Sequence, residues 1–295
     1  MAPDDVVLEV GAADGQLTRP LLQRASLVHA FEIDRRYQSR LARLAAEHSN
    51  LRVHEGDALK VDLKALEPPP TALVANLAYN IAIPLIMTSI AELPSVRRWG
   101  VMVQKELADR LFAAPSTKAY AAVSVLVQLA CRRLETRPVP PSAFRPRPRV
   151  DSSFVTFVRR EAADAGGAGS DAPGGAGELP APLTAAEYAA MDRLVRIAFG
   201  QRRKVLTNTL AGAAHAGVTL SRDEVRRALA ELGLGASARP EELSPGRWAA
   251  FARLTGWLPA AGGPAPEAFA ASAAPTSAAP PGDPAPPPPG TEVDA

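Results

Sequence analysis

The stretch VVLEVGAADG, residues 6–15, is a short apolar run that leads directly into a turn with two glycines. Gly11 and Gly15 permit a tight turn and the close approach of a ligand to the backbone. The turn is not a full G-x-G-x-x-G, and it lacks the Lys-Ser/Thr pair of a phosphate-binding P-loop. By itself it predicts only a strand and a βα turn, which an ordinary α/β domain would also have.

Similar apolar runs recur after this turn and alternate with helical patterns. Leu41, Leu44 and Ala45, for example, share one face of a helix predicted over residues 35–48. Alternation of strands and helices predicts a parallel sheet covered on both faces, and so a Rossmann-like α/β fold. The further predicted strands are LVHAFEI (27–33), LRVHE (51–55), TALVAN (71–76), WGVMVQ (99–104) and SFVTFVRR (153–160).

Composition divides the chain into four segments. Residues 1–160 form the predicted α/β domain, and residues 183–261 carry only helical patterns, which begin with Thr184 as an N-cap residue. Residues 161–182 are rich in Gly and Ala, and residues 262–295 hold ten of the 29 prolines. Neither segment can bury enough apolar surface to offset its chain entropy, so we expect a flexible linker and a disordered tail. The predicted architecture is an α/β domain followed by a small all-α domain.

Length, cysteine content and charge narrow the class of protein. The 295 residues include one cysteine, Cys131, which excludes an intrachain disulfide and is expected to be a buried small apolar residue. No run approaches the roughly 18 apolar residues of a membrane span, and the start MAPDDVVLEV lacks the pattern of a signal peptide. We expect a soluble cytoplasmic monomer without a membrane partner. Residues 1–160 carry 22 Lys and Arg against 16 Asp and Glu, a net charge of +6 that suits a polyanionic partner.

Polar residues follow four of the predicted strands. Glu32 ends the second strand, 21 residues after Gly11, where a carboxylate can accept hydrogen bonds from ribose hydroxyls, although a solvated strand end is an equally plain interpretation. Asp57 and Ala58 follow the third strand, and Asn76 ends the fourth. Open α/β sheets bind ligands at this edge. The order of glycine turn, acid, Gly-Asp and Asn-Leu-x-Tyr favours S-adenosylmethionine over NAD as the cofactor.

The segment Asn76-Leu77-Ala78-Tyr79 has the chemistry that transfer of a methyl group to an amino nitrogen needs. The side-chain oxygen of Asn76 and the backbone carbonyl of Leu77 can accept the two N–H bonds of an exocyclic amine. The Tyr79 ring can stack on the base and hold it in line with the methyl group. The motif predicts an enzyme that methylates a base.

Seven segments follow one another in the order seen in bacterial small-subunit rRNA adenine N6,N6-dimethyltransferases, which the chain resembles over about residues 5–255. The RRK and F-x-P-x-P-x-V-D-S segments are more specific than the glycine turn, and the similar large-subunit resistance enzymes match them less well. The resemblance implies a class I S-adenosylmethionine-dependent methyltransferase sheet. The segments are VLEVGAADGQLT, FEID, EGDAL, NLAYNIAIPL, VMVQKELADRLFAAPSTKAYAAVSVLVQ, FRPRPRVDSSFV and FGQRRKVLTNTL.

The resemblance also implies a substrate and roles for single residues. The family dimethylates two adjacent adenines near the 3′ end of 16S rRNA during assembly of the 30S subunit. Phe144 would be a second aromatic at the target pocket, although a core aromatic before a proline turn is the other interpretation. The implied cofactor residues are Glu9, Gly11 and Gly15 at the methionine end, Glu32 at the ribose and Asp57 with Ala58 at the adenine; Asn76, Leu77 and Tyr79 would hold the target adenine.

The sequence departs from the family at three places. The chain starts almost on its first strand, where relatives carry an upstream basic segment with a G-Q-x-F motif. Ala13 stands where the family usually has Gly, and a methyl group there would crowd the cofactor unless the loop shifts. Ala78 replaces the Pro of Asn-Leu-Pro-Tyr, which keeps the Leu77 carbonyl but removes a rigid residue from the loop.

Basic residues in three segments are candidates for contacts with RNA. Proline alternates with arginine over residues 145–149, so the guanidinium groups should project separately from an extended backbone. We predict phosphate contacts at these sites, although solvated surface clusters are the plainer interpretation of composition alone. Residues 202–204 are expected to open a helix of the second domain. The candidates are Arg145, Arg147 and Arg149, then Arg202, Arg203 and Lys204, and finally Lys105 and Arg110, which with Lys118 should flank the active site.

Two other functions remain open at this point. The short start, Ala13 and Ala78 are compatible with a non-catalytic RNA-binding assembly factor, and the Asn-x-x-Tyr motif is shared with the 23S rRNA methyltransferases that confer antibiotic resistance. No metal is expected, because the four histidines form no ligand spacing.

Overall fold

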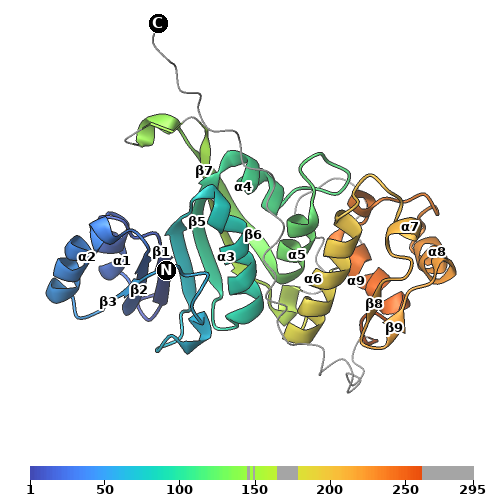
Figure 1. Cartoon of the computed structure of the whole chain (residues 1–295), viewed down its shortest axis with the longest axis horizontal. Coiled ribbons are helices and arrows are strands. Elements are labelled where there is room, and N and C mark those ends of the chain that lie inside the picture. Colours follow the sequence, from blue (N-terminus) through green and yellow to red (C-terminus); the bar gives the residue numbers. More distant parts are fainter. Residues whose placement is uncertain (145–146, 149, 165–178, 261–295) are drawn as a thin grey trace, which may run out of the picture.

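A computed structural model describes residues 1–144, 147–148, 150–164 and 179–260. A seven-stranded sheet occupies one part of the molecule, and a smaller, mainly helical part adjoins it (Figure 1). Most of the predicted linker and the whole predicted tail, residues 262–295, lie outside the described residues.

The sheet has the strand order β3-β2-β1-β4-β5-β7-β6. Its first five strands are parallel, and β7 (Ser152–Arg159) runs antiparallel between β5 and β6. The C-terminal ends of the parallel strands therefore share one edge, and the strand order reverses at β1, where such sheets bind ligands. The parallel strands are β1 (Val6–Val10), β2 (Leu27–Glu32), β3 (Leu51–Glu55), β4 (Ala72–Asn76) and β5 (Arg98–Gln104).

Strand β6 (Cys131–Val139) is absent from the strands predicted above. It is an edge strand of the sheet, and only Cys131 in it is buried. An exposed edge strand needs no alternation of apolar and polar residues, and its charged side chains and Pro138 protect it from pairing with other chains. The signal that identifies a strand in a sequence is therefore missing here.

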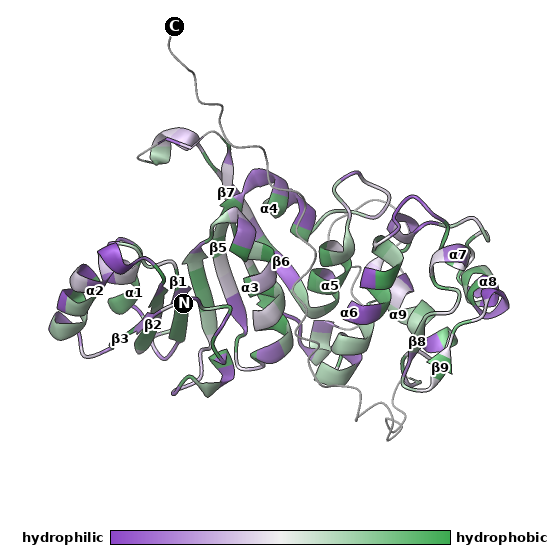
Figure 2. Ribbon diagram, viewed as in Figure 1, coloured by the Kyte–Doolittle hydropathy of each residue, from purple (hydrophilic) through white to green (hydrophobic). Residues whose placement is uncertain are grey.

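Helices cover both faces of the sheet, as predicted. One apolar cluster joins Leu41 and Leu44 to Val7 and Val28 on the face of β1 and β2 that α1 and α2 cover. A larger cluster contains Leu8 and Leu73 of the opposite face with the apolar residues of α3, α4 and α5. In Figure 2, β1 and β2 are mostly hydrophobic, because every residue in them is buried. The helices are α1 (Thr18–Leu22), α2 (Arg35–Glu47), α3 (Tyr79–Glu92), α4 (Lys105–Leu111) and α5 (Ala122–Ala130).

The C-terminal part begins as predicted with Thr184 as an N-cap, whose hydroxyl accepts a hydrogen bond from the Glu187 backbone N–H at 3.3 Å. Its helices pack through Trp248, Phe251 and Trp257, which are at most 1% exposed. The described chain contains no helix with the length and apolar character needed to cross a membrane. The helices are α6 (Ala185–Phe199), α7 (Leu206–Thr209), α8 (Arg222–Glu231) and α9 (Pro245–Leu254); short 3-10 helices span Leu63–Ala65, Pro141–Ala143, Ala162–Asp164 and Pro240–Glu242.

The expectation that this part is purely helical is wrong in one detail. A small antiparallel hairpin pairs β8 (Ala214–His215) with β9 (Val218–Thr219). Its two turn residues, Ala216 and Gly217, have φ angles of 48° and 83°, as a type I′ turn requires. Alanine rarely adopts this conformation, so the pair Ala-Gly is a weaker hairpin signal than Asn-Gly would be.

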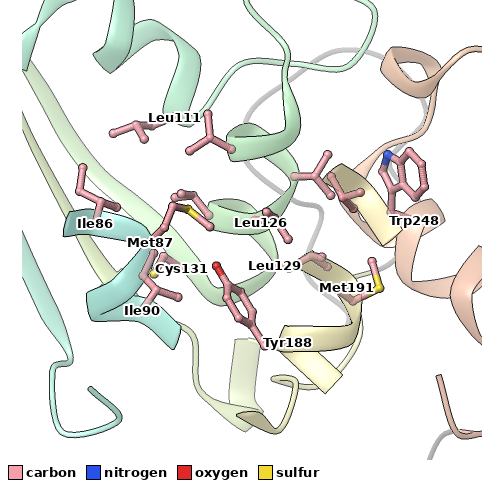
Figure 3. Packing of buried hydrophobic residues seen from close by; sticks show 14 of the residues in the cluster. Ile86, Met87, Ile90, Leu111, Leu126, Leu129, Cys131, Tyr188, Met191 and Trp248 are labelled. Atoms are coloured by element: carbon pink, nitrogen blue, oxygen red, sulfur yellow. The ribbon is translucent and has the colours of Figure 1, made fainter. Parts of the chain in front are cut away.

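The sheet and the helical part share one continuous hydrophobic core. Ile90 of α3, Leu129 of α5 and Tyr188 of α6 belong to a single cluster, which extends to Trp248 of α9 (Figure 3). Cys131 lies in it, as expected for a small apolar residue, and burial raises the pKa of its thiol to about 12. A shared core of this kind holds the two parts in one arrangement.

Arg160 fastens both ends of the segment that joins the two parts. The side chain is 4% exposed, and its Nη2 donates to the carbonyls of Asp164 at 3.0 Å and Pro180 at 2.8 Å. Its Nη1 donates to the carbonyl of Leu129 at 3.0 Å. The buried guanidinium of Arg160 thus contacts the chain both where it leaves the sheet part and where it enters the helical part.

Candidate active site

The turn after β1 meets the end of β4 at the C-terminal edge of the sheet. Gly11 and Gly15 have φ angles of 81° and 82°, which favour glycine. A Cβ on Gly11 would lie 3.7 Å from the backbone oxygen of Asn76, and one on Gly15 would lie 3.0 Å from the Leu44 side chain. The structure thus brings the glycine turn and the Asn-Leu-Ala-Tyr segment together.

Glu32 lies at the same edge, at the end of β2, and its carboxylate is 6% exposed. One oxygen accepts the backbone N–H of Ala13 at 2.7 Å and the other accepts that of Asp34 at 2.8 Å. These bonds fix the orientation of the carboxylate and leave each oxygen one more lone pair for a ligand. Glu32 is therefore held in place by the glycine turn that it faces.

Ala13, the residue that departs from the family pattern, adopts a φ of 47°. This left-handed conformation costs a residue with a Cβ about 1 to 2 kcal/mol. The backbone keeps it because the Ala13 N–H bonds to Glu32, so the turn retains the conformation that glycine would take freely. Alanine at position 13 therefore strains the backbone of the turn without changing its conformation.

Glu9 is a buried carboxyl without a hydrogen-bond partner among the described residues. It is 1% exposed, and neither of its oxygens is satisfied. Burial raises its pKa from 4.5 to about 7; the adjacent Thr18 hydroxyl, which does not reach hydrogen-bond geometry, offsets part of the rise, and the charge of Glu32 adds to it. Buried carboxyls are rarely left unpaired, so Glu9 is a group prepared for a ligand.

Asp57 and Ala58 follow β3 next to the end of β2. The backbone N–H of Gly56 donates to the Glu32 carbonyl at 3.0 Å, which ties the two strand ends together. One Asp57 oxygen accepts the Leu59 N–H at 3.0 Å, and the other lies 3.8 Å from the Lys60 ammonium. Ala58 is buried, with 4% of its surface exposed.

Ile33 was not predicted as a site residue. It follows Glu32 directly and is 65% exposed, although it is a large apolar side chain. This exposure has no signal in the sequence, because Ile33 continues the apolar run of residues 27–33.

Asn76, Leu77 and Tyr79 lie where β4 leads into α3. Asn76 is exposed at the end of the strand, and the Leu77 backbone N–H donates to the Met102 carbonyl at 2.9 Å. Within the described residues, nothing donates to the Leu77 carbonyl or the Asn76 side chain. Tyr79 begins the helix with 59% of its surface exposed. Two acceptors and one aromatic ring are thus free at a single point.

Phe144 and Arg147 lie in the segment between β6 and β7. The backbone N–H of Phe144 donates to the Pro141 carbonyl at 3.2 Å, and its side chain is half-buried, whereas Arg147 is exposed. The Lys105 backbone N–H donates to the Asp151 carbonyl at 2.9 Å, which places the end of this segment beside the start of α4. Arg145 and Arg149 lie outside the described residues.

The other predicted RNA contacts differ in their surroundings. Lys105 pairs with Asp109 at 2.6 Å and Arg110 with Glu106 at 2.7 Å, each within one helix. Residues 202–204 form the turn between α6 and α7 and do not open a helix, because Val205 is the N-cap residue of α7. Arg203 and Lys204 are exposed, and Arg202 is half-buried.

Two histidines with no recognisable spacing in the sequence meet across β2 and β3. His29 Nδ1 lies 3.0 Å from His54 Nε2, and His29 Nε2 lies 3.0 Å from the Pro68 carbonyl. Burial lowers the pKa of both imidazoles, so the pair is neutral and structural at physiological pH. Among the described residues, no three His, Cys, Asp or Glu side chains are grouped to hold a metal.

Known proteins share this sequence over most of its length. Residues 1–165 match the family model of ribosomal RNA adenine dimethylases. The chain is 43% identical over 249 residues to the ribosomal RNA small subunit methyltransferase A of Rubrobacter xylanophilus, with 84% of both chains covered. It is 39% identical over 273 residues to the protein of the same name from Kineococcus radiotolerans, with 90% of this chain and 82% of that one covered.

Solved structures show the same fold. A dimethyladenosine transferase from Plasmodium falciparum aligns with a TM-score of 0.66 and 26% identity, covering 85% of this chain and 90% of its own. The 23S rRNA methyltransferase ErmE aligns with a TM-score of 0.59 and 25% identity, covering 86% and 92%. The expected class I S-adenosylmethionine-dependent methyltransferase sheet is thereby confirmed, and the chain belongs to the ribosomal RNA adenine dimethylase family.

Proposed function

We propose that this chain is an S-adenosylmethionine-dependent rRNA adenine N6,N6-dimethyltransferase that acts on small-subunit rRNA. The observation that carries the proposal is the meeting of Glu9, Glu32 and Asp57 with the free acceptors of Asn76 and Leu77 at one edge of the sheet. The specific substrate is two adjacent adenines near the 3′ end of 16S rRNA, in an immature 30S subunit. The chain works as a cytoplasmic monomer.

The residues at this edge fit the chemistry of the cofactor. Glu9 offers a buried carboxyl without a partner to the methionine ammonium, and Gly11 and Gly15 let the backbone approach the ligand. Glu32 keeps lone pairs for the ribose hydroxyls, while Asp57 and the Ala58 backbone would recognise the adenine. When bound, S-adenosylmethionine supplies an electrophilic methyl carbon on a positively charged sulfur.

Asn76, Leu77 and Tyr79 would position the target amine. In the first transfer Asn76 Oδ1 and the Leu77 carbonyl would accept the two N6 hydrogens, which favours a more tetrahedral nitrogen with an available lone pair; in the second transfer one of them would accept the single hydrogen that remains. Tyr79, together with Phe144, stacks on the flipped base and keeps the nitrogen in line with the methyl group. No strong general base is required, because the proton leaves an amine that has become positively charged.

A methyl-transfer assay with the Asn76→Ala variant tests this proposal. The assay would measure transfer of labelled methyl groups to undermethylated 30S subunits, and calorimetry would measure S-adenosylmethionine binding. We expect transfer to fall by roughly 100-fold or more, because an interaction made to the reacting amine is lost. Asn208→Ala is the matched control, since Asn208 is exposed on α7 and its side chain makes no described hydrogen bond.

Two outcomes would overturn the proposal. A wild-type chain that binds rRNA but transfers no methyl group would be an RNA-binding assembly factor. Methyl groups mapped to 23S rRNA would instead indicate the large-subunit activity, although the curated relatives named above are small-subunit enzymes. Analytical ultracentrifugation would test the monomeric state.

A further inference from the structure

Arg202 belongs to a basic triplet, but its guanidinium is already engaged. Nη1 donates to the Lys118 carbonyl at 3.1 Å and Nη2 donates to the Thr117 carbonyl at 3.1 Å. Nε lies 3.7 Å from Glu241 Oε2, too far for a hydrogen bond but close enough for an ion pair. That carboxylate oxygen is buried and has no hydrogen-bond partner, and the Arg202 guanidinium is the cation that faces it.

The loop between α4 and α5 makes two further contacts with the 3-10 helix Pro240–Glu242 and the residue after it. This contact region is the joint between the sheet part and the helical part. The Ser116 backbone N–H donates to the Glu241 carbonyl at 2.7 Å, and the Tyr120 hydroxyl donates to the Leu243 carbonyl at 2.8 Å. Ser116 has a φ of 62°, a conformation that side chains with a Cβ rarely adopt. Such strain persists only where the surroundings impose the backbone path, so the helical part determines the shape of this loop.

Three cations remain free where the two segments meet. Lys118, Arg203 and Lys204 are exposed, and within the described residues none of them has an ion pair or a side-chain hydrogen bond. Lys105 and Arg110, by contrast, each face a carboxylate of their own helix at less than 3 Å. Because Arg202 Nη1 reaches the Lys118 carbonyl, the backbone of Lys118 lies within one arginine side chain of residue 202, which Arg203 and Lys204 follow directly.

This joint lies on the substrate side of the molecule. The α4–α5 loop and the C-terminal end of α6 lie on the same upper side of Figure 1 as α4, which follows β5 at the C-terminal edge of the sheet. A polyanion that reaches Asn76 at that edge can extend along the same side to the joint. Cations without a carboxylate neighbour contribute most to binding phosphates, since they have no internal ion pair to break.

We infer that Lys118, Arg203 and Lys204 form one phosphate-binding surface for RNA and that Arg202 is a positioning residue, which holds Lys118 in place and does not contact RNA itself. The inference rests on the proposed function, because it names a binding surface for that RNA substrate. It removes Arg202 from the predicted RNA contacts and gives Lys118 a direct role.

Arg→Lys substitutions distinguish an arginine that binds a phosphate from an arginine that donates to two backbone carbonyls. A lysine at a phosphate contact keeps most of the binding, because one charge is enough, but a lysine cannot donate to two carbonyls in a fixed fork. We therefore expect Arg203→Lys to bind RNA like the wild type and Arg202→Lys to bind several-fold more weakly. Binding would be measured by fluorescence anisotropy with a labelled transcript of the 3′-terminal region of small-subunit rRNA at a series of salt concentrations.

A double-mutant cycle tests whether Arg202 acts through Lys118. Lys118→Ala should reduce the slope of log K against log salt by about 0.9, as expected for one lost phosphate contact. Arg202→Lys combined with Lys118→Ala should bind no more weakly than the weaker single variant. Additive losses, or wild-type binding by Arg202→Lys, would overturn the positioning role.

Glu241→Gln tests the positioning role, because the two explanations predict opposite changes in RNA affinity. Loss of a negative charge near a phosphate site should strengthen RNA binding if only long-range electrostatics matter. Loss of the partner of Arg202 should weaken binding if the joint positions Lys118. Thermal unfolding of every variant would identify those that have simply lost the fold.

The outcomes also distinguish this inference from the proposed function. If the wild type methylates rRNA while Lys118→Ala keeps its affinity and salt slope, the phosphate surface is wrong and the enzyme assignment stands. If the wild type binds the transcript with the predicted slopes but transfers no methyl group, the surface stands and the enzyme assignment fails. If the wild type methylates 30S subunits but does not bind the transcript, the phosphate surface is wrong and the enzyme assignment stands.

Discussion

The carboxyl of Glu9 at the C-terminal edge of the sheet and the guanidinium groups of Arg159 and Arg160 at the junction with the helical part have opposite surroundings. At the edge, both oxygens of Glu9 are buried without a hydrogen-bond partner, and Ala13 keeps a strained backbone. At the junction, Arg159 donates to the carbonyls of Val96, Ile90 and Leu93 at 2.9 to 3.1 Å, and Arg160 has three carbonyl partners of its own.

Charged groups whose hydrogen bonds are made stabilise the fold, whereas the unpaired carboxyl of Glu9 costs stability. If Glu9 binds the cofactor as proposed above, this loss of stability serves binding. Tyr188 shows the limit of this rule, because its buried hydroxyl also lacks a hydrogen-bond partner although it lies in the core, far from the predicted site residues in the chain. A neutral hydroxyl costs less to leave unsatisfied than a carboxylate. Substitutions at the two regions should therefore change stability in opposite directions.

The largest expected effect is at the junction. Arg160→Ala removes three hydrogen bonds from a charged group and leaves the carbonyls of Leu129, Asp164 and Pro180 without a donor. We expect a loss of about 3 to 5 kcal/mol in the free energy of unfolding, measured by urea denaturation. Arg132→Ala, which breaks a partly exposed ion pair between β6 and Asp164, should cost less than about 1 kcal/mol. Equal losses of unfolding free energy in the two variants would show that the buried hydrogen bonds of Arg160 stabilise the fold no more than an exposed ion pair does.

The next largest effect is a gain of stability when Glu9 is replaced, and the size of this gain depends on pH. The pKa of Glu9 is raised to about 7 in the folded chain from 4.5 in the unfolded chain, so the folded state binds the proton more tightly. The stability that this proton provides is complete below pH 4.5 and is lost as the pH rises to about 7, by up to roughly 3 kcal/mol.

Glu9→Gln removes this dependence. We expect the variant, without cofactor, to gain stability relative to the wild type between pH 5 and pH 8, and to bind S-adenosylmethionine more weakly at pH 8. Urea unfolding across the pH range and calorimetry would measure both. A stability difference that does not change with pH would show that Glu9 is not the titrating group.

A smaller gain is expected in the glycine turn. Ala13→Gly relieves a φ of 47° and should stabilise the free protein by about 0.5 to 1 kcal/mol, the left-handed strain less the added chain entropy of glycine. The adjacent Ala12→Gly is the control, because Ala12 is buried and has no positive φ, so the same change should destabilise the protein. Thermal unfolding of both variants would show whether the signs differ.

The smallest effect is expected at the start of α3. Ala78 has φ and ψ angles of −63° and 149°, which proline adopts without strain, and its backbone N–H makes no described hydrogen bond. Ala78→Pro should therefore stabilise the chain by about 0.5 kcal/mol by restricting the unfolded state and should not lower methyl transfer. Ala82→Pro in the same helix should cost about 3 kcal/mol. A loss of stability in Ala78→Pro would mean that this loop moves in the free protein.

Local patterns predict the residues that lie at the edge of the sheet. Buried parallel strands are mainly apolar runs, so β1, β2, β4 and β5 and the polar residues at their ends follow directly from the sequence. Thr184 is also predicted from local sequence, because an N-cap residue bonds to a residue only three positions further along the chain. The ligand roles of these residues stay predictions, since they depend on a bound cofactor and RNA.

Contacts between distant parts of the chain decide the rest. The exposed edge strand β6, the hydrogen-bonded pair of His29 and His54 and the engagement of Arg202 by the Thr117 and Lys118 carbonyls have no local signal. In the sequence Arg202, Arg203 and Lys204 are alike, but the fold turns one of them inward and leaves two in solvent. By itself the sequence determined the parallel strands, the order of the polar residues at their ends and the family; only the tertiary structure decided the edge strand β6 and which charges are neutralised, because pairing depends on residues far apart in the chain.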